Sequence, residues 1–365
     1  MKKFSILLVI VLIVFAYRAQ SQGCVAIRST GAICTKTEAG HDDSKGWQLN
    51  TSYRYFRSHR HFVGKEEQVE REEQGTQVIN WQHTMNFTLV RNLNSRWSVA
   101  VDVPILSNRR SSLYEHGGNS GGENARHTTS SFGIGDVRFS VYRWLIDPMK
   151  SFRGNIQVGL GIKLATGDYR YQDFFWKNDS TKILGPVDQS IQLGDGGTGF
   201  TAEVNAYYNF SRTIGVYGNF FYLVNPREQN GVSTARGANA SATAIKYNTS
   251  TMSVPDQYMA RGGVNLTFQK LTVSAGGRFE CIPSSDLVGG DGGFRRPGYV
   301  LSLEPGLAYN TKKVTFFATV PIALERNRTQ SNGDKLRTED TGVYTHGDAA
   351  FADWAIFAGI SFRFK

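Results

Sequence analysis

The chain has 365 residues, in which 41 Lys and Arg stand against 31 Asp and Glu, and 40% of the residues are hydrophobic. That hydrophobic share excludes an intrinsically disordered chain, because it supplies ample surface to bury. Beyond the N-terminal segment, no apolar run approaches the about 18 residues that a membrane-spanning helix needs. Helical membrane proteins are therefore excluded as well.

The N-terminus has the pattern of a secretory signal peptide, which we predict to span residues 1–21. Lys2 and Lys3 precede an unbroken apolar segment, and the small residues Ala19 and Ser21 stand before the expected cleavage site. The protein is therefore expected to leave the cytoplasm. In that location its basic excess does not indicate a nucleic-acid partner.

Residues 22–45 form a polar segment with too little apolar content to fold alone. In an oxidising compartment, Cys24 and Cys34 are predicted to form a disulfide. The alternative is that Cys24 is the lipidated first residue of a lipoprotein. We expect the segment either to plug the periplasmic mouth of the domain that follows or to remain a free tail, since undocked chain ends are usually mobile.

Residues 46–365 repeat the alternation that is typical of β-strands. Between Ile79 and Leu89, the odd positions are Ile, Trp, His, Met, Phe and Leu, whereas the even positions are Asn, Gln, Thr, Asn and Thr. Segments of this kind are predicted as strands at 47–56, 79–89, 97–105, 132–145, 155–165, 200–210, 214–224, 257–268, 271–282, 299–309, 313–324 and 354–364. The connections between them are alternately tight turns and long polar segments.

This pattern predicts the fold class. The segments have about 10 to 13 residues, which is enough to cross a bilayer when a strand is tilted. Alternating short turns and long loops around an even number of strands are typical of an outer-membrane barrel. We therefore predict an all-β protein, a transmembrane antiparallel β-barrel of about 12 strands, in the outer membrane of a Gram-negative bacterium. The short turns and both chain ends would face the periplasm.

The expected partners follow from this location. The apolar face of the strands would contact the lipid bilayer, and basic loops would meet the phosphates of lipopolysaccharide. Near the C-terminus, Gly359 is followed by Phe362 and Phe364. That spacing resembles the signal that the outer-membrane insertion machinery reads.

The face opposite to the apolar one would line the lumen. Its charged residues, basic and acidic in equal number, are Arg54, Asp102, Asp136, Arg138, Lys163, Glu203, Arg261, Arg278, Glu280, Glu304, Asp353 and Arg363. The aromatic residues on this face are Phe56, Tyr142, Tyr207, Tyr217, Phe221, Phe317 and Phe357. Balanced charges can pair and hold the wall rigid, or they can bind a solute, and the sequence leaves both open. The passage, on the order of 10 Å, would admit a small molecule but not a folded polypeptide.

No motif indicates an enzyme, a cofactor or a metal. The glycine-rich stretch 194–199 lacks the Gly-Lys-Ser/Thr of a phosphate-binding loop and is interpreted as a flexible loop. His59, His61, His116 and His127 lack the spacing of a zinc site and are interpreted as solvated loop residues. We therefore predict no catalytic residues and no bound cofactor.

Three short motifs also carry a family resemblance. The stretches 133–137 (Gly-Ile-Gly-Asp-Val), 161–168 (Gly-Ile-Lys-Leu-Ala-Thr-Gly-Asp) and 194–199 resemble outer-membrane transporters grouped under the meta-pathway of phenol degradation. Ala165 stands where that family tends to place Pro. The resemblance implies an outer-membrane barrel and a link with aromatic compounds.

Two functions are consistent with the sequence. The first is a channel for passive or facilitated passage of small organic solutes, including aromatic or hydrophobic ones, with the solute itself unknown. The alternative is a closed structural or surface-binding barrel that works through its long extracellular loops. Abundant pairing among the lumen charges would favour the closed barrel, and an uncompensated layer of charge would favour the channel.

Overall fold

The computed structural model describes residues 45–114, 125–151, 153–236 and 238–364. The predicted signal peptide lies outside the described residues, as do Cys24 and Cys34 of the predicted disulfide. No helix in the part of the chain that is described is long and apolar enough to cross a membrane.

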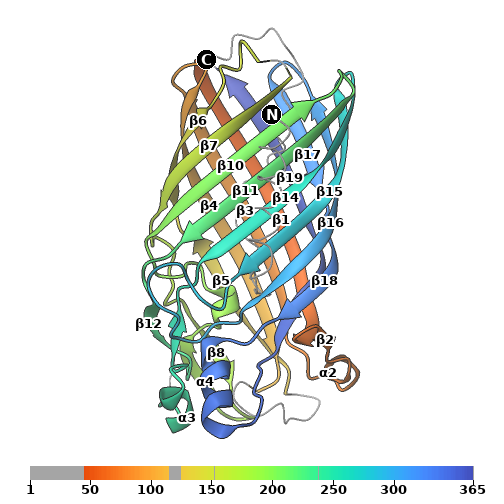
Figure 1. The fold of residues 1–365 in the computed structure, drawn as a ribbon. Helices are drawn as coiled ribbons and strands as arrows, with labels where there is room; N and C mark the ends of the chain where they lie inside the picture. The colour runs from red at the N-terminus through yellow and green to blue at the C-terminus, as the bar shows by residue number, and fades with distance from the viewer. Residues whose placement is uncertain (1–44, 115–124, 152, 237, 365) are drawn as a thin grey trace.

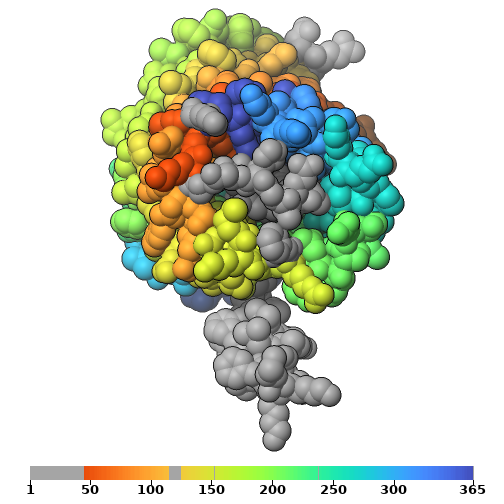
Figure 2. Space-filling view, turned by 90° about the horizontal axis from the view of Figure 1, so that it is seen from above, coloured from red at the N-terminus to blue at the C-terminus, as the bar shows by residue number. Residues whose placement is uncertain are grey.

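The chain forms a closed antiparallel barrel of twelve strands (Figure 1). Its wall consists of β1 (Gly46–Val63), β3 (Ile79–Asn92), β4 (Trp97–Ser112), β5 (His127–Ile134) continued by β6 (Arg138–Trp144), β7 (Gly154–Lys163), β10 (Gly199–Asn209), β11 (Ile214–Val224), β14 (Gln257–Phe268), β15 (Leu271–Ile282), β16 (Gly298–Asn310), β17 (Val314–Thr319) continued by β18 (Ile322–Arg328), and β19 (Ala349–Phe364). The barrel closes where β19 pairs with β1. Figure 2 looks onto the end with the short turns, where the coloured wall makes a ring. The predicted fold class is confirmed.

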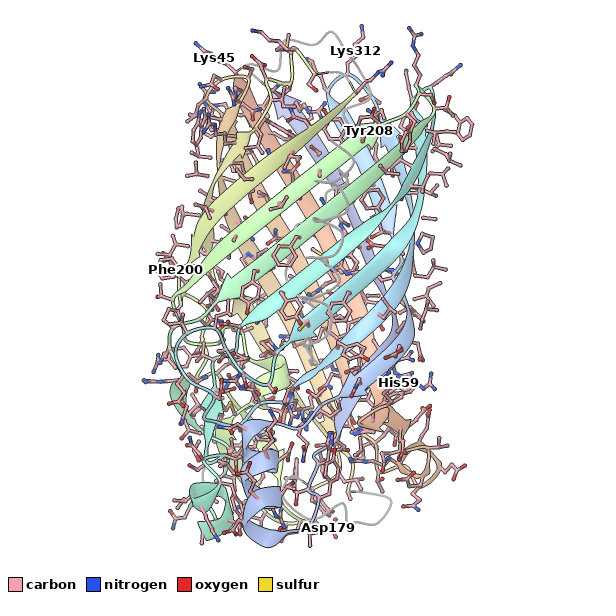
Figure 3. All side chains as sticks on the ribbon, viewed as in Figure 1. Lys45, His59, Asp179, Phe200, Tyr208 and Lys312 are labelled. Carbon is pink, nitrogen blue, oxygen red and sulfur yellow. The ribbon has the colours of Figure 1, made fainter. Side chains whose placement is uncertain are left out.

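The strands turn one face inward and the other outward along the wall. In β4, Ala100 and Asp102 are each 4% exposed, whereas Val99, Val101 and Val103 between and beside them are partly exposed. Large apolar side chains cover the outer face in all parts of the wall, and Leu160 of β7 reaches 71% exposure (Figure 3). Such a surface is stable only against lipid, so the outer face is the membrane-facing one.

Two strands of the wall are interrupted, although each was predicted as one segment. Between β5 and β6, the ladder with β7 ends at Arg138 opposite Lys163, and the N–H of Val137 donates to Thr166 Oγ1 at 2.8 Å. Between β17 and β18, Pro321 has no N–H to give to a ladder. At the first break the outward positions change from even, with Phe132 and Ile134, to odd, with Phe139 and Val141, so the strand is shifted by one residue. At the second break the alternation continues, with Phe316, Ile322 and Leu324 all exposed, and so it does not reveal the interruption.

Several strands also run past their predicted ends into the region of the long loops. Because β1 extends to Val63, His61 lies in a strand and is only 4% exposed. Its Nδ1 is 2.7 Å from Asp348 Oδ2, and its Nε2 accepts the N–H of Val78 at 2.8 Å. The ring is therefore neutral with its proton on Nδ1, and the interpretation of His61 as a solvated residue is wrong.

The long loops carry their own small elements, all at one end of the barrel (Figure 1). These are β2 (Glu66–Glu67), α2 (Glu70–Glu73), β8 (Gln172–Trp176), β9 (Lys182–Pro186), η1 (Gln189–Ile191), β12 (Gln229–Ser233), α3 (Ala242–Lys246), β13 (Thr251–Ser253) and α4 (Asn332–Thr341). α4 starts with a capping box of Ser331 and Asp334 and ends at Gly342, whose φ of 68° favours glycine. We call this end the loop end and the opposite one the turn end.

The register predicts how the wall tolerates charge. Val101 faces lipid, so Val101→Arg should lower the free energy of unfolding by roughly 2–4 kcal/mol, as is usual for Arg deep in the bilayer. Val101→Ala, the matched control, should have a much smaller effect because little protein packs on that face. Urea unfolding in lipid vesicles measures both. An Arg variant as stable as the Ala variant would contradict the assignment of the lipid face.

Candidate functional site

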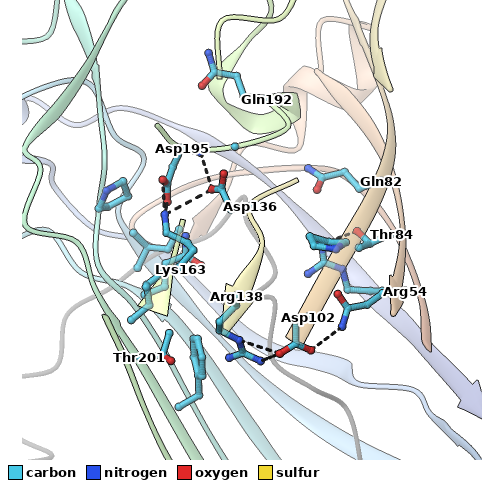
Figure 4. A pocket seen from close by; sticks show the side chains of 18 of the residues that line it. Arg54, Gln82, Thr84, Asp102, Asp136, Arg138, Lys163, Gln192, Asp195 and Thr201 are labelled. Atoms are coloured by element: carbon cyan, nitrogen blue, oxygen red, sulfur yellow. Dashed lines mark hydrogen bonds and ion pairs between the residues drawn. The ribbon is translucent and has the colours of Figure 1, made fainter. Parts of the chain in front are cut away.

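The lumen contains three clusters of charged side chains, and Arg138 is the centre of the first. Its Nη2 and Nε lie 2.9 and 3.2 Å from Asp102 Oδ2, and its Nη1 lies 2.6 Å from Glu203 Oε1. Asp102 on β4 is directly opposite Arg138 on β6 in the ladder, so strand register alone brings them together. All three are at most 6% exposed. Figure 4 shows the contact between Arg138 and Asp102.

Lys163 at the end of β7 is the centre of the second cluster. Its Nζ contacts the carboxylate of Asp195 and lies 3.6 Å from Asp136 Oδ2 (Figure 4). Asp136 also accepts the backbone N–H groups of Gly167 and Asp195, at 3.0 and 3.2 Å. The three glycine-containing motifs of the sequence therefore meet at this one place.

Gly194 explains why glycine is needed there. A Cβ on this residue would lie 2.5 Å from Asp136 Oδ1 and 2.7 Å from the carbonyl oxygen of Gly167. Gly196 has a φ of 83°, and a Cβ there would lie 2.8 Å from the ring of Tyr169. The interpretation of 194–199 as a flexible loop is wrong, because close packing and not mobility accounts for these glycines.

The third cluster joins four neighbouring strands, β11 and β14 to β16. Glu304 Oε1 lies 3.2 Å from Arg261 Nη1 and 3.8 Å from Arg278 Nη1. Arg278 also donates to Glu280 at 2.8 Å, and Arg261 donates to Asn219 at 2.7 Å. Two guanidinium groups and two carboxylates thus balance each other within the wall.

The remaining predicted lumen residues lie outside these clusters. Arg54 is 6% exposed and donates to Thr84 Oγ1 at 3.2 Å. Asp353 lies toward the loop end, 2.7 Å from both Arg60 and Arg326. Arg363 has no side-chain partner among the described residues. The predicted aromatic residues are all buried, namely Phe56, Tyr142, Tyr207, Tyr217, Phe221, Phe317 and Phe357.

A segment that the sequence analysis treated as part of a long outer loop folds into the barrel. This mouth segment, residues 187–195, contains η1 and crosses the loop end of the lumen. Gln82 and Asn108 of the wall donate to its carbonyl groups at 2.7 and 3.3 Å, and its Gln189 donates to Ser253 O at 3.0 Å. Ile191 is fully buried. Apolar residues within an otherwise polar loop are the one sequence signal that indicates this burial.

Asp188 anchors the mouth segment. It binds Arg296 with both carboxylate oxygens, at 2.9 and 2.8 Å, and Arg110 of β4 lies 3.6 Å away. The same carboxylate accepts the N–H of Ser190 at 2.9 Å and so caps η1. Burial alone would raise the pKa of Asp188, but Arg110 and Arg296 outweigh it and hold that pKa well below its ordinary value.

Below the mouth segment lies a cavity of about 150 Å³. One side is charged, with Arg54, Asp102, Arg138 and Lys163 from the arc between β1 and β7. The other side is apolar, with Phe221, Leu223, Ile282, Phe317 and Phe357 from the arc between β11 and β19. Gln189, Ser190 and Gln192 of the mouth segment complete the lining. The cavity thus offers a polar and an aromatic face to one molecule.

Among the described residues, no group of three or more His, Cys, Asp or Glu side chains is arranged to hold a metal ion. Cys281 is 1% exposed in β15, where Tyr258 and Tyr299 are its neighbours in the ladder. The charged clusters pair carboxylates with Arg or Lys, which leaves no carboxylate set of the kind that binds calcium or magnesium.

Comparison with known proteins supports the fold. No family model matches the chain, and no curated protein matches it. An outer-membrane channel from Pseudomonas putida F1 has a similar structure, with a TM-score of 0.54 and 11% identity over 90% of this chain and 100% of that chain. At this identity the likeness shows a shared barrel fold. Without a matching family model, the resemblance to the phenol-pathway transporters stays a prediction.

Two further solved structures are more distant. The translocator domain of the autotransporter NalP from Neisseria meningitidis has a TM-score of 0.42 and 11% identity, over 87% of this chain and 88% of that chain. The CymD monoaromatic hydrocarbon channel has a TM-score of 0.41 and 10% identity, over 88% of this chain and 89% of that chain. Neither similarity is close enough to support an argument about function.

The first cluster predicts a large cost for removing its cation. Arg138→Gln leaves Asp102 and Glu203 buried without a counter-charge, so the free energy of unfolding should fall by roughly 3–5 kcal/mol. Arg138→Lys keeps the charge and should cost clearly less. Denaturant unfolding of the purified barrel measures the difference. Equal costs for Gln and Lys would mean that the charge does not hold the cluster together.

The anchor of the mouth segment predicts a pH range. A depressed pKa means that the ion pairs of Asp188 stabilise the segment above the unfolded pKa of about 4 and are lost only as the pH falls through the lower folded value. Hydrogen exchange of residues 187–195 should therefore stay slow from neutral pH down to about pH 4. Asp188→Asn should speed that exchange roughly tenfold or more at every pH in this range.

The control for this measurement is Asp173→Asn. Asp173 of β8 accepts the N–H of Ser130 of β5 and does not contact the mouth segment. Its variant should leave exchange in residues 187–195 unchanged. Equal exchange in wild-type protein and Asp188→Asn would refute the anchoring role of Asp188.

Proposed function

We propose that the protein is an outer-membrane channel through which small organic solutes pass along the barrel lumen. The observation that carries the proposal is the cavity under the mouth segment, with a charged side and an aromatic side. Its volume of about 150 Å³ holds on the order of ten water molecules, which is room for one ring-sized solute. The barrel fold shared with an outer-membrane channel from Pseudomonas putida F1 is consistent with this function.

The orientation is part of the proposal. The turn end faces the periplasm, as is usual for the short turns of outer-membrane barrels, and the loop end faces the exterior. A solute would then enter past the mouth segment, and the pairing of Asp188 with Arg296 would set how readily the segment yields. An antibody tag at Asn332, the first residue of α4, should be accessible on intact cells, whereas a tag at Ser211 in a short turn should not.

The expected solute is an aromatic or hydrophobic molecule with at least one polar group. Phe221, Phe317 and Phe357 present rings to the cavity, and Arg138 and Lys163 lie on its other side. Arg138 Cζ is 5.4 Å from the centre of the Phe221 ring, so the charged and the aromatic sides of the cavity meet there. A ring can stack on the aromatic side while a polar substituent meets the charged side.

Transport measurements test the proposal. Purified protein in planar bilayers should give discrete single-channel currents, and Asp188→Asn should increase the open fraction. In liposome swelling assays, Phe221→Leu should slow entry of an aromatic solute roughly three- to tenfold but not that of a sugar of similar size, because one aromatic contact contributes about 0.5–1.5 kcal/mol. Phe139→Leu, which removes a ring from the lipid face, is the matched control.

A closed structural or surface-binding barrel is the second candidate. The pairing of the lumen charges in three clusters favours it, since paired charges stiffen a wall without needing a solute. The closed barrel would be supported if neither the wild-type protein nor Asp188→Asn gives single-channel currents. A heat-dependent shift in gel mobility would show that both barrels are folded in that experiment. Currents in the wild-type protein would decide against the closed barrel.

A further inference from the structure

Basic residues gather at the turn end of the barrel. The strand ends and short turns there carry Lys45, Arg91, Arg96, Arg143, Lys150, Arg153, Arg212, Lys270, Lys312 and Lys313. Asp147 is the one carboxylate among the described residues of these turns, and its Oδ1 is occupied by the N–H of Met149 at 3.0 Å. Figure 3 shows Lys45 and Lys312 at the same end of the molecule. We call these basic residues the basic rim.

Within the part of the chain that the structure describes, the basic rim has no counter-charge. None of its side chains forms an ion pair with a carboxylate among the described residues. Elsewhere cations do find carboxylates, as Arg138 pairs with Asp102 in the lumen and Arg295 pairs with Asp286 at 2.7 Å in a loop. Repulsion between so many like charges costs stability unless anions from outside the chain compensate it.

Two guanidinium groups of the rim stack on tryptophans of the lipid-facing surface. Arg91 Cζ lies 4.9 Å from the centre of the Trp47 ring, and Arg143 Cζ lies 5.1 Å from that of Trp97. In each pair the two residues are directly opposite in neighbouring strands. Tryptophan at a strand end lies at the depth of the lipid headgroups. A guanidinium group on its face keeps N–H groups free for the phosphate at that depth.

Apolar side chains are exposed in the same turns. Leu93 is 48%, Ile146 is 52%, Met149 is 48% and Phe210 is 63% exposed. Basic and apolar side chains next to each other are typical of a surface that enters an anionic headgroup layer. A soluble acidic partner would explain the charges but not these apolar residues or the stacked tryptophans.

We propose that the basic rim binds anionic phospholipid, with Arg91 on Trp47 and Arg143 on Trp97 as two headgroup sites. The inference rests on the proposed orientation, in which the turn end meets the inner, phospholipid leaflet of the outer membrane. Each guanidinium binds a headgroup phosphate, the indole beneath it contacts the upper acyl chain, and the turn cations hold further headgroups by charge alone. Lipid charge then replaces the missing carboxylates and fixes the barrel at a defined depth.

Lipid retention tests the proposal directly. Full-length mature protein is placed in mixed vesicles of phosphatidylcholine and phosphatidylglycerol, extracted gently, and its bound lipids are counted by native mass spectrometry. The wild-type protein should retain phosphatidylglycerol in preference to phosphatidylcholine. The double variant Arg91→Gln/Arg143→Gln should lose that preference roughly tenfold, because each cation near an anionic surface contributes a severalfold factor.

A matched control removes two comparable cations far from the rim. Arg170 lies 5.1 Å over the ring of Tyr169, and Lys182 lies 4.3 Å over that of Phe174, both in the long loops. Arg170→Gln/Lys182→Gln removes the same charge and the same type of aromatic contact. Retention of phosphatidylglycerol by this variant should equal that of the wild-type protein. If both double variants lose phosphatidylglycerol equally, net charge alone explains the retention, and the two proposed headgroup sites are wrong.

The wild-type protein provides a test that does not depend on the folding of any variant. Its preference for phosphatidylglycerol should decrease as salt is added, because the contacts lie at the edge of the bilayer where ions screen them. Equal retention of both lipids at low salt would overturn the proposal. Single-channel currents are recorded on the same samples, so a protein that selects phosphatidylglycerol but carries no current would count against the channel alone.

Discussion

The closed hydrogen-bond ladder between β1 and β19 is the constraint on which the rest of the structure depends. In hydrocarbon no water can satisfy an unpaired N–H or C=O group, so a spanning sheet is stable only without an edge. The pairing runs from Trp47 opposite Phe364 to Phe62 opposite Ala349, which seals the wall along its length. Once the wall is closed, each side chain has only two directions, toward lipid or toward the lumen.

That division decides which charges must find partners. Charges directed inward are removed from bulk water, and neighbouring strands supply the compensation, as Asp102 does for Arg138 and Glu304 does for Arg261. Arg54, Asp102, Arg138 and Lys163 line one arc of the cavity and the aromatic residues the other, so a two-sided space remains between them. The charged side chains of the lumen can therefore be paired and rigid while the cavity beside them stays accessible.

The two ends of the barrel differ in how their basic side chains are compensated. At the loop end, folded loops supply carboxylates to several cations, as Asp188 of the mouth segment does for Arg296 and Glu67 of β2 does for Arg60. At the turn end, the turns are too short to fold back, and the cations there form no ion pair with a carboxylate of the described residues. The same cause, the length of the connections, thus gives the molecule one end where loops supply carboxylates and another end where anionic lipid supplies the counter-charge.

The sequence by itself determined the fold class, the number of strands in the wall and the face on which Asp102 and Val101 lie, because a period of two is a local property of the chain. Only the tertiary structure decided how those residues combine. The meeting of Asp136, Lys163 and Asp195, the burial of His61 in an extended β1, and the insertion of residues 187–195 into the mouth join segments far apart in the chain. Alternation contains no information about such contacts, since they depend on which loops fold back over the closed wall.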